Sequence, residues 1–141
     1  MKTAVKVLDS YSLIAYFEGE AGAKSVVHAL KTARDSGVPL LISVVNWGEV
    51  YYITLREAGT ERADQVVEVI STLPIEIVMP DLELTREAAR LKARGGIAYA
   101  DCFAAALAKL RKSELMTGDR EFKQVQDVVK ILDRLKSCAA R

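Results

Sequence analysis

Sulfur and imidazole ligands are scarce in this chain, which has two cysteines, Cys102 and Cys138, and one histidine, His28. The cysteines fit neither a metal-ligand spacing nor a disulfide framework, and His28 is expected on the surface of a helix. A zinc centre built from sulfur or imidazole therefore has no support. The low cysteine content also favours a reducing, cytoplasmic location.

Long apolar segments are missing as well. No stretch approaches the roughly 18 consecutive apolar residues of a membrane span, and the amino-terminal residues lack the apolar core of a signal peptide. With only 3 prolines and 8 glycines, and half of its residues hydrophobic, the chain has a globular composition without a low-complexity tract. We therefore expect a single domain over residues 1–141 that does not enter a membrane.

Short apolar runs alternate with helical patterns along the whole chain. Strands are predicted at residues 5–9, 40–42, 75–78, 115–116 and 128–132, and helices at 10–17, 22–35, 44–58, 60–72, 81–94, 99–112 and 120–124. Ser43 and Thr60 are expected to cap the helices that follow them. The alternation predicts an α/β fold with five parallel strands, helices on both faces and right-handed crossovers, and it leaves the strand order open.

Asp9 stands at the carboxyl end of the first predicted strand, the edge at which open α/β sheets bind ligands. The simpler interpretation is an N-cap for the helix that begins at Ser10. Asp81, Asp119 and Asp133 also follow predicted strands. The local pattern alone therefore does not separate a functional acid from a helix cap.

Two more acids lie inside predicted helices. Glu49 shares a helix face with Asn46, although a solvated polar stripe gives the same spacing. Asp101 lies one turn ahead of alanines at 104, 105 and 108, a smooth surface that permits close packing on the sheet. Its carboxylate is therefore expected to point inward, where it needs a partner or a metal. The alternative for Asp101 is an exposed acid favoured by the helix dipole.

Four segments together resemble the signature blocks of PIN-domain nucleases, and above all the small VapC-type ribonuclease toxins of toxin–antitoxin pairs. These segments are VLDSYSLIAYF, ISVVNWGEVYY, YADCFAAALA and LMTGDREF, in the family's order and spacing. The resemblance implies a three-layer α/β/α fold with strand order 3-2-1-4-5. Strands 1 and 4 would then be neighbours, about 4.8 Å apart, with Asp9 beside Asp119. Asp81 and Asp133 would follow the edge strands and act as caps.

The resemblance also implies an acidic site, made of Asp9, Glu49, Asp101 and Asp119. Two carboxylates about 4 Å apart repel by roughly 4 kcal/mol at an effective dielectric of about 20, so four ionised acids need a cation. Oxygen ligands suit Mg²⁺ or Mn²⁺. Glu49 would be a ligand or the acceptor of the attacking water's proton, and the three aspartates would be ligands. Thr117 and Asn46 would hold these groups in place.

The implied activity is a divalent-metal-dependent endoribonuclease, the toxin of a toxin–antitoxin pair, which leaves 5′-phosphate and 3′-hydroxyl ends. Because the net charge is only +1, contacts to RNA phosphates have to come from local basic residues near the last two acids. The candidates are Arg94, Arg111, Lys112 and Arg120. The resemblance further implies a cognate antitoxin that covers the site with a basic segment.

A homodimer is expected because the chain has more aromatic and apolar surface than short strands and their helices need. These residues are Tyr11, Ile14, Phe17, Tyr51 and Tyr52, and the alternative is that all of them belong to the core.

Two other functions fit part of the pattern. A binding module could use the acidic pocket only to dock a basic partner segment, without turnover. An aspartyl-phosphate phosphatase would use Asp9 as its nucleophile, but that chemistry usually has a second aspartate two residues later, where this chain has Tyr11.

The chain departs from the PIN pattern before its sixth predicted helix. The sequence Gly95-Gly96-Ile97-Ala98 stands where the family often has a Ser or Thr that caps the helix, so the start of this helix and the direction of Asp101 depend on the loop.

Overall fold

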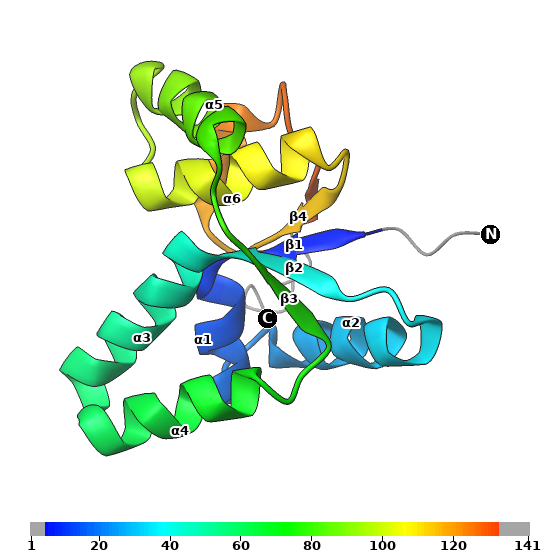
Figure 1. Ribbon diagram of the computed structural model, residues 1–141, viewed down its shortest axis with the longest axis vertical. Coiled ribbons are helices and arrows are strands. Elements are labelled where there is room, and N and C mark those ends of the chain that lie inside the picture. The colour runs from blue at the N-terminus through cyan, green and yellow to red at the C-terminus, as the bar shows by residue number, and fades with distance from the viewer. Residues whose placement is uncertain (1–4, 133–141) are drawn as a thin grey trace.

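The computed structural model describes residues 5–132 (Figure 1). Its elements in chain order are β1 (Lys6–Leu8), α1 (Ser10–Glu18), α2 (Ala23–Ser36), β2 (Leu40–Ser43), α3 (Val44–Ala58), α4 (Thr60–Ile70), β3 (Ile75–Val78), α5 (Leu82–Ala93), α6 (Tyr99–Leu110), β4 (Glu114–Met116), the 3₁₀ helix η1 (Arg120–Val125) and β5 (Ile131–Leu132).

The strands form one parallel sheet in the order β3-β2-β1-β4-β5, which confirms the predicted α/β class and strand order. Leu8 of β1 lies beside Ile42 of β2 on one side and beside Met116 of β4 on the other. The chain leaves β1 toward β2 and β3 and later returns to β4, so the strand order reverses between β1 and β4. The residues that follow these two strands therefore meet at the switch point of the sheet.

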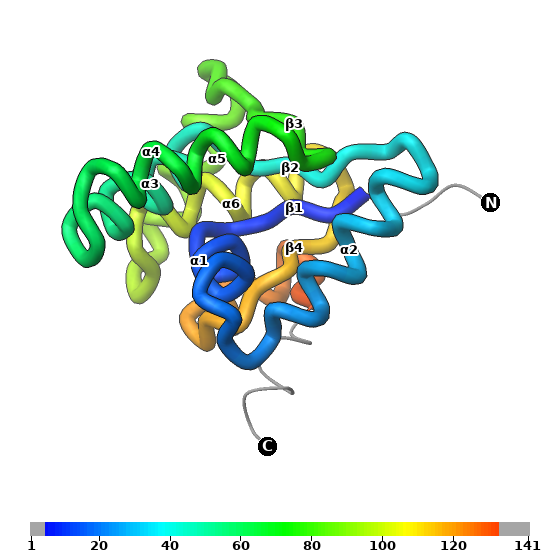
Figure 2. The backbone as a smooth tube through the Cα atoms, turned by 90° about the horizontal axis from the view of Figure 1, so that it is seen from below, coloured from blue at the N-terminus to red at the C-terminus, as the bar shows by residue number. Residues whose placement is uncertain are grey.

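Helices cover both faces of the sheet (Figure 1). Alternate residues of a strand face opposite sides, so Val7 of β1 packs against α5 and α6 while Leu8 packs toward α1, α2 and α4. Figure 2 views the molecule from the side of α1 and α2. The central strands are buried on both faces, which is why they are almost entirely apolar in sequence.

Several predicted boundaries differ from the structure by one or two residues, and larger differences concern the fifth strand and the cap of α4. The fifth strand was expected from Val128, but the backbone N–H groups of Val128 and Val129 both donate to the Val125 carbonyl in a turn, which leaves only Ile131 and Leu132 as strand. Thr60 was expected to cap α4, but it is the first helical residue, and Gly59 occupies the cap position without a side-chain hydrogen bond.

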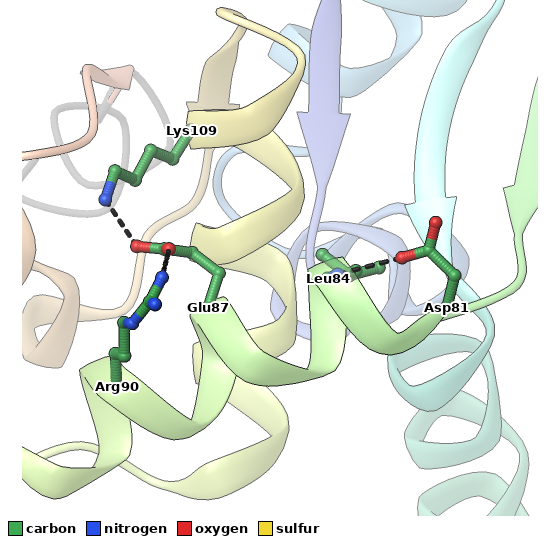
Figure 3. A network of polar contacts seen from close by, with 5 residues as sticks. All are labelled: Asp81, Leu84, Glu87, Arg90 and Lys109. Carbon is green, nitrogen blue, oxygen red and sulfur yellow. Dashed lines mark hydrogen bonds and ion pairs between the residues drawn. The ribbon is translucent and has the colours of Figure 1, made fainter.

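The predicted caps Ser43 and Asp81 do cap α3 and α5. Ser43 Oγ accepts from the N–H of Val45 at 3.2 Å, and Asp81 Oδ1 accepts from the N–H of Leu84 at 2.8 Å (Figure 3). Asp133 lies outside the described residues. Within the part of the chain that the structure describes, no helix has the length and apolar character needed to cross a membrane.

The packing of α5 against α6 includes an ion-pair network around Glu87 (Figure 3). Glu87 is only 7% exposed, and its carboxylate accepts from Lys109 of α6 and, at 3.1 Å, from Arg90 of its own helix. The hydrogen bond from Lys109 is the main reason why the pKa of Glu87 lies below its usual value, and Arg90 lowers it further.

We expect Glu87→Gln to lower the free energy of unfolding by about 1 kcal/mol at neutral pH, since both cations are partly solvated and lose only one charged acceptor. Because the folded-state pKa is lowered, the contribution of Glu87 is present above its ordinary pKa of 4.5 and is lost as the pH falls through the lower folded value. Urea unfolding of both proteins across this pH range should show the difference shrink in acid. Glu68 is an exposed acid of α4 and serves as the control. If Glu68→Gln lowered the free energy of unfolding by the same amount, the stabilising role of the ion pairs of Glu87 would be refuted.

Candidate active site

The four predicted acids come from four different elements at the carboxyl edge of the sheet. Asp9 follows β1 directly and caps α1, and Asp119 follows β4 and caps η1. Glu49 lies in α3, and Asp101 is the third residue of α6. The charges of Glu49, Asp119 and Asp9 all raise the pKa of Asp101, so the structure brings the four carboxylates into one electrostatic environment.

Thr117 links the two central strands at this edge. The register pairs Leu8 with Met116, so Asp9 and Thr117 leave their strands side by side. The Thr117 hydroxyl donates to Asp9 Oδ2 and accepts from the backbone N–H of Asp119 at 3.0 Å. One buried hydroxyl thus sets the positions of the segments that carry both aspartates.

Asp9 is buried and highly hydrogen-bonded. Its Oδ1 accepts from the Ser12 N–H at 2.9 Å and lies 2.8 Å from Ser12 Oγ, which is also 2.6 Å from the Met116 carbonyl. The single hydrogen of the Ser12 hydroxyl therefore lies between two acceptors, Asp9 Oδ1 and the Met116 carbonyl. Burial raises the pKa of Asp9 to about 6, against the hydrogen bonds from Thr117 and Ser12, which lower it.

Asp101 points inward, as the alanine pattern predicted, and is 8% exposed. Its pKa is raised to about 7, first by burial and then by the negative charges of Glu49, Asp119, Asp9 and Glu121, in that order. The site therefore holds Asp101 in surroundings that disfavour its charge, a cost that either a proton or a bound cation relieves.

Glu49 is held by two donors on the same oxygen. Ser10 Oγ and Asn46 Nδ2 each lie 3.0 Å from Glu49 Oε1, and Asn46 Nδ2 also donates to the Ala100 carbonyl at 3.1 Å. The buried Asn46 side chain thus ties α3 to the residue before Asp101. Asn46 Oδ1 is buried without a protein partner among the described residues, which leaves an acceptor for a water at this site.

Glu121 is the acid that sequence reasoning missed. One carboxylate oxygen each from Asp101, Asp119 and Glu121 lies within 4.8 Å of the other two, and we refer to these residues as the acidic triad. Asp119 Oδ1 accepts from the Glu121 N–H at 2.9 Å, which bends the chain so that the two carboxylates lie close together. The only sequence signal was a second acid two residues after Asp119.

The donor chemistry of the acidic triad fits a hard divalent cation. All three ligand groups are carboxylates, and the described residues around them offer neither sulfur nor imidazole at this position. Such closely spaced negative charges are unfavourable without neutralisation, and they add to the effect of burial in raising the pKa of Asp101. Carboxylate oxygens of this kind suit hard divalent cations in general.

The four predicted phosphate contacts are not all near the acids. Arg120 is exposed between Asp119 and Glu121. The Arg94 guanidinium donates instead to the Gln124 carbonyl and to Asp127. Arg111 and Lys112 follow the far end of α6, roughly 15 Å along the helix from Asp101.

Comparisons with known proteins identify several with a similar fold. The chain is similar in structure to the DNA-bound VapBC complex of Salmonella typhimurium, with a TM-score of 0.74 and 19% identity over 94% of this chain and 99% of that one. VapBC2 of Rickettsia felis, bound to a promoter DNA fragment, gives a TM-score of 0.72 and 16% identity over 91% and 97% of the two chains. VapC20 of Mycobacterium tuberculosis, a toxin that cleaves the sarcin-ricin loop, gives 0.62 and 17% over 85% and 94%.

At these identities the likeness is one of fold. No curated protein matches the chain. The model of the family described as PIN domain matches residues 6–128, which include β1, β4 and all five acids discussed above. The chain therefore belongs to the PIN-domain family.

Proposed function

We propose that the protein is an endoribonuclease that hydrolyses RNA phosphodiester bonds with Mg²⁺ or Mn²⁺. The observation that carries this proposal is the acidic triad at the switch point of the sheet, with Asp9 and Glu49 around it. Membership of a nuclease family supports hydrolysis. The oxygen-only donor set supports a hard divalent metal, and the switch point of the sheet is the edge at which open α/β folds bind ligands.

Each residue has a role that its contacts suggest. Asp101, Asp119 and Glu121 would hold the cation. Asp9 would join them through Oδ2, which accepts only one protein hydrogen bond among the described residues, from Thr117. A bound Mg²⁺ or Mn²⁺ supplies water activation and neutralises charge on the reacting phosphate.

Glu49 is suited to take a proton from the attacking water. Two donors fix its Oε1, so its carboxylate is oriented before substrate arrives. Thr117 and Asn46 keep the acids in place, and the exposed Arg120 is positioned to contact a substrate phosphate beside Asp119.

We further propose that the protein is a VapC-type toxin with a small cognate antitoxin, acting on RNA in the cytoplasm. Its structural neighbours include VapBC assemblies and a toxin–antitoxin complex from Klebsiella pneumoniae, which matches with a TM-score of 0.69 and 19% identity. Exposed aromatic side chains support a protein partner: Tyr11 is 39% and Tyr52 47% exposed, and Ile14 and Phe17 line a groove of about 320 Å³ between α1, α3 and α4. The same apolar surface supports the expected homodimer.

Incubation of the purified protein with RNA tests the proposal. We expect cleavage with Mn²⁺ or Mg²⁺, none with EDTA, and products with 5′-phosphate ends that a 5′-phosphate-dependent exonuclease degrades. Metal should also raise the melting temperature by mass action. Intact RNA in the presence of both metals, together with tight binding of a basic peptide, would instead indicate a binding module without turnover.

A further inference from the structure

Helix α6 carries Asp101 in its first turn, yet no side chain caps that turn. The N-cap residue is Ala98, which has no side-chain acceptor for the free backbone N–H groups. Before it, Gly95 and Gly96 both adopt left-handed conformations, with φ of 83° and 81°. The loop over residues 95–98 therefore decides where α6 begins, and whatever holds this loop also positions Asp101.

Two side chains from outside the loop bind its carbonyl groups. Lys92 Nζ donates to the Ile97 carbonyl at 2.9 Å, and Gln124 Nε2 donates to the Gly96 carbonyl. The approach of Gln124 is so close that a Cβ at position 96 would lie 1.8 Å from Gln124 Oε1. The left-handed backbone conformation favours glycine at 96, and a larger residue there would also displace the Gln124 amide.

Gln124 is itself held by the end of α5. Arg94 Nη2 donates to the Gln124 carbonyl at 3.0 Å and pairs with Asp127 Oδ1 at 2.9 Å. Gln124 belongs to η1, the 3₁₀ helix that Asp119 caps and that contains Glu121. We use the term loop clamp for the side chains of Arg94 and Gln124 with three hydrogen bonds. Arg94 donates to the Gln124 carbonyl and to Asp127, and Gln124 donates to the Gly96 carbonyl. The loop clamp connects the segment before Asp101 to the segment that bears the other two acids of the triad.

The acidic triad is the place where such a connection matters. Its three carboxylates come from two separate segments, and their mutual repulsion pushes those segments apart when no cation is bound. A cation site is tight only if its ligands stay close before binding, because the free energy spent on bringing them together is lost from affinity. The loop clamp opposes this separation.

We propose that Gln124, supported by Arg94, is a positioning residue that keeps Asp101 in register with Asp119 and Glu121 for metal binding. This inference rests on the proposed function. We expect the fold itself to survive loss of the clamp, because Gln124 and Arg94 are exposed, whereas the buried side chains of Phe122 and Val125 anchor η1 in the core. Figure 1 shows the orange segment that contains η1 next to α5 and α6.

The test compares Gln124→Ala with Gln126→Ala, an exposed glutamine just after η1 whose side chain has no described contact. Removing a group that orients metal ligands typically costs about 10-fold or more in affinity. We expect this loss in the Mn²⁺ affinity of Gln124→Ala, measured by titration calorimetry, and none in Gln126→Ala. The metal-free melting temperatures should be nearly equal. RNA cleavage by Gln124→Ala should be weak at low Mn²⁺ and recover at saturating Mn²⁺.

A merely structural role has a different signature. It would lower the melting temperature equally with and without Mn²⁺ and leave the affinity unchanged, and that result would overturn the inference. Arg94→Met provides a second variant, with a smaller loss of affinity in the same direction, and the double variant should lose little more than Gln124→Ala alone. Unchanged Mn²⁺ affinity in both variants of an active protein would refute the clamp only, whereas a wild type without Mn²⁺ binding or cleavage would refute the proposed function as well.

Discussion

Asp101→Asn is expected to abolish metal-dependent RNA cleavage while making the metal-free protein more stable at neutral pH. Asp101 would hold the cation that neutralises charge on the reacting phosphate, an effect worth several kcal/mol, so without this ligand the rate should fall by a factor of about 100 or more. The gain in stability has a separate origin, because the wild-type carboxylate is buried next to four other acids. Asparagine has nearly the same shape and carries no charge.

The pH dependence of this gain follows from the pKa of Asp101. Its folded-state pKa of about 7 lies above the ordinary value of 3.8, so the folded state binds the proton more tightly than the unfolded state does. The wild type therefore loses stability as the pH rises from about 4 to about 7, and it loses no more from this group above that range. Asp101→Asn should lack this part of the decline.

Melting temperatures of the metal-free proteins across this range measure the effect. The two curves should lie close together near pH 4 and separate toward pH 7, with the variant above the wild type. Addition of Mn²⁺ should close the gap, since it stabilises the wild type and stabilises the variant much less. A variant that is less stable than the metal-free wild type at neutral pH would contradict the crowded-acid explanation.

Asp9→Asn is expected to remove cleavage and weaken Mn²⁺ binding with little effect on folding. The asparagine Oδ1 can still accept from the Ser12 N–H, and its Nδ2 can donate to Thr117 Oγ1, so the cap of α1 is kept. What the substitution removes is a carboxylate oxygen and a negative charge beside Asp119.

Asp81→Asn is the matched control for this change. Both aspartates follow a strand and cap a helix, and each accepts from the backbone N–H three residues later, at 2.9 Å for Asp9 and 2.8 Å for Asp81. Asp81 follows the edge strand β3, away from the switch point. RNA cleavage and the Mn²⁺-induced rise in melting temperature should survive in Asp81→Asn and disappear in Asp9→Asn. Equal activity in the two variants would mean that Asp9 is only a cap.

Asp9 and Asp81 show which features the local sequence could predict and which it could not. A strand followed by an aspartate and a helix occurs at both positions, and at both the aspartate caps the helix, as predicted for Asp81 and as the alternative given for Asp9. Only the strand order separates them, because β1 lies at the switch point and β3 at the edge. Strand order depends on contacts between distant segments, and here it came from the resemblance of four sequence blocks to a family.

The inward direction of Asp101 was predictable because helix periodicity fixes which residues share a face, and the alanines marked the face that packs on the sheet. The place of Glu121 in the acidic triad was not predictable, because its approach to Asp119 depends on a 3₁₀ turn. In sequence this turn cannot be told from an ordinary solvated acidic turn. The bond from Ser10 to Glu49 spans 39 positions, and the bond from Gln124 to Gly96 spans 28. Such contacts follow from the assembled fold.

Titration of the protein with Mn²⁺ by calorimetry, in two buffers of different ionisation enthalpy, tests most directly whether these acids share one cation. At about pH 6, Asp9 with a pKa of about 6 and Asp101 with a pKa of about 7 hold protons that metal binding has to displace. We predict release of about one proton for each Mn²⁺ bound at that pH, falling toward zero at about pH 8.5. Binding at about pH 6 without proton release, or no binding at either pH, would contradict the account.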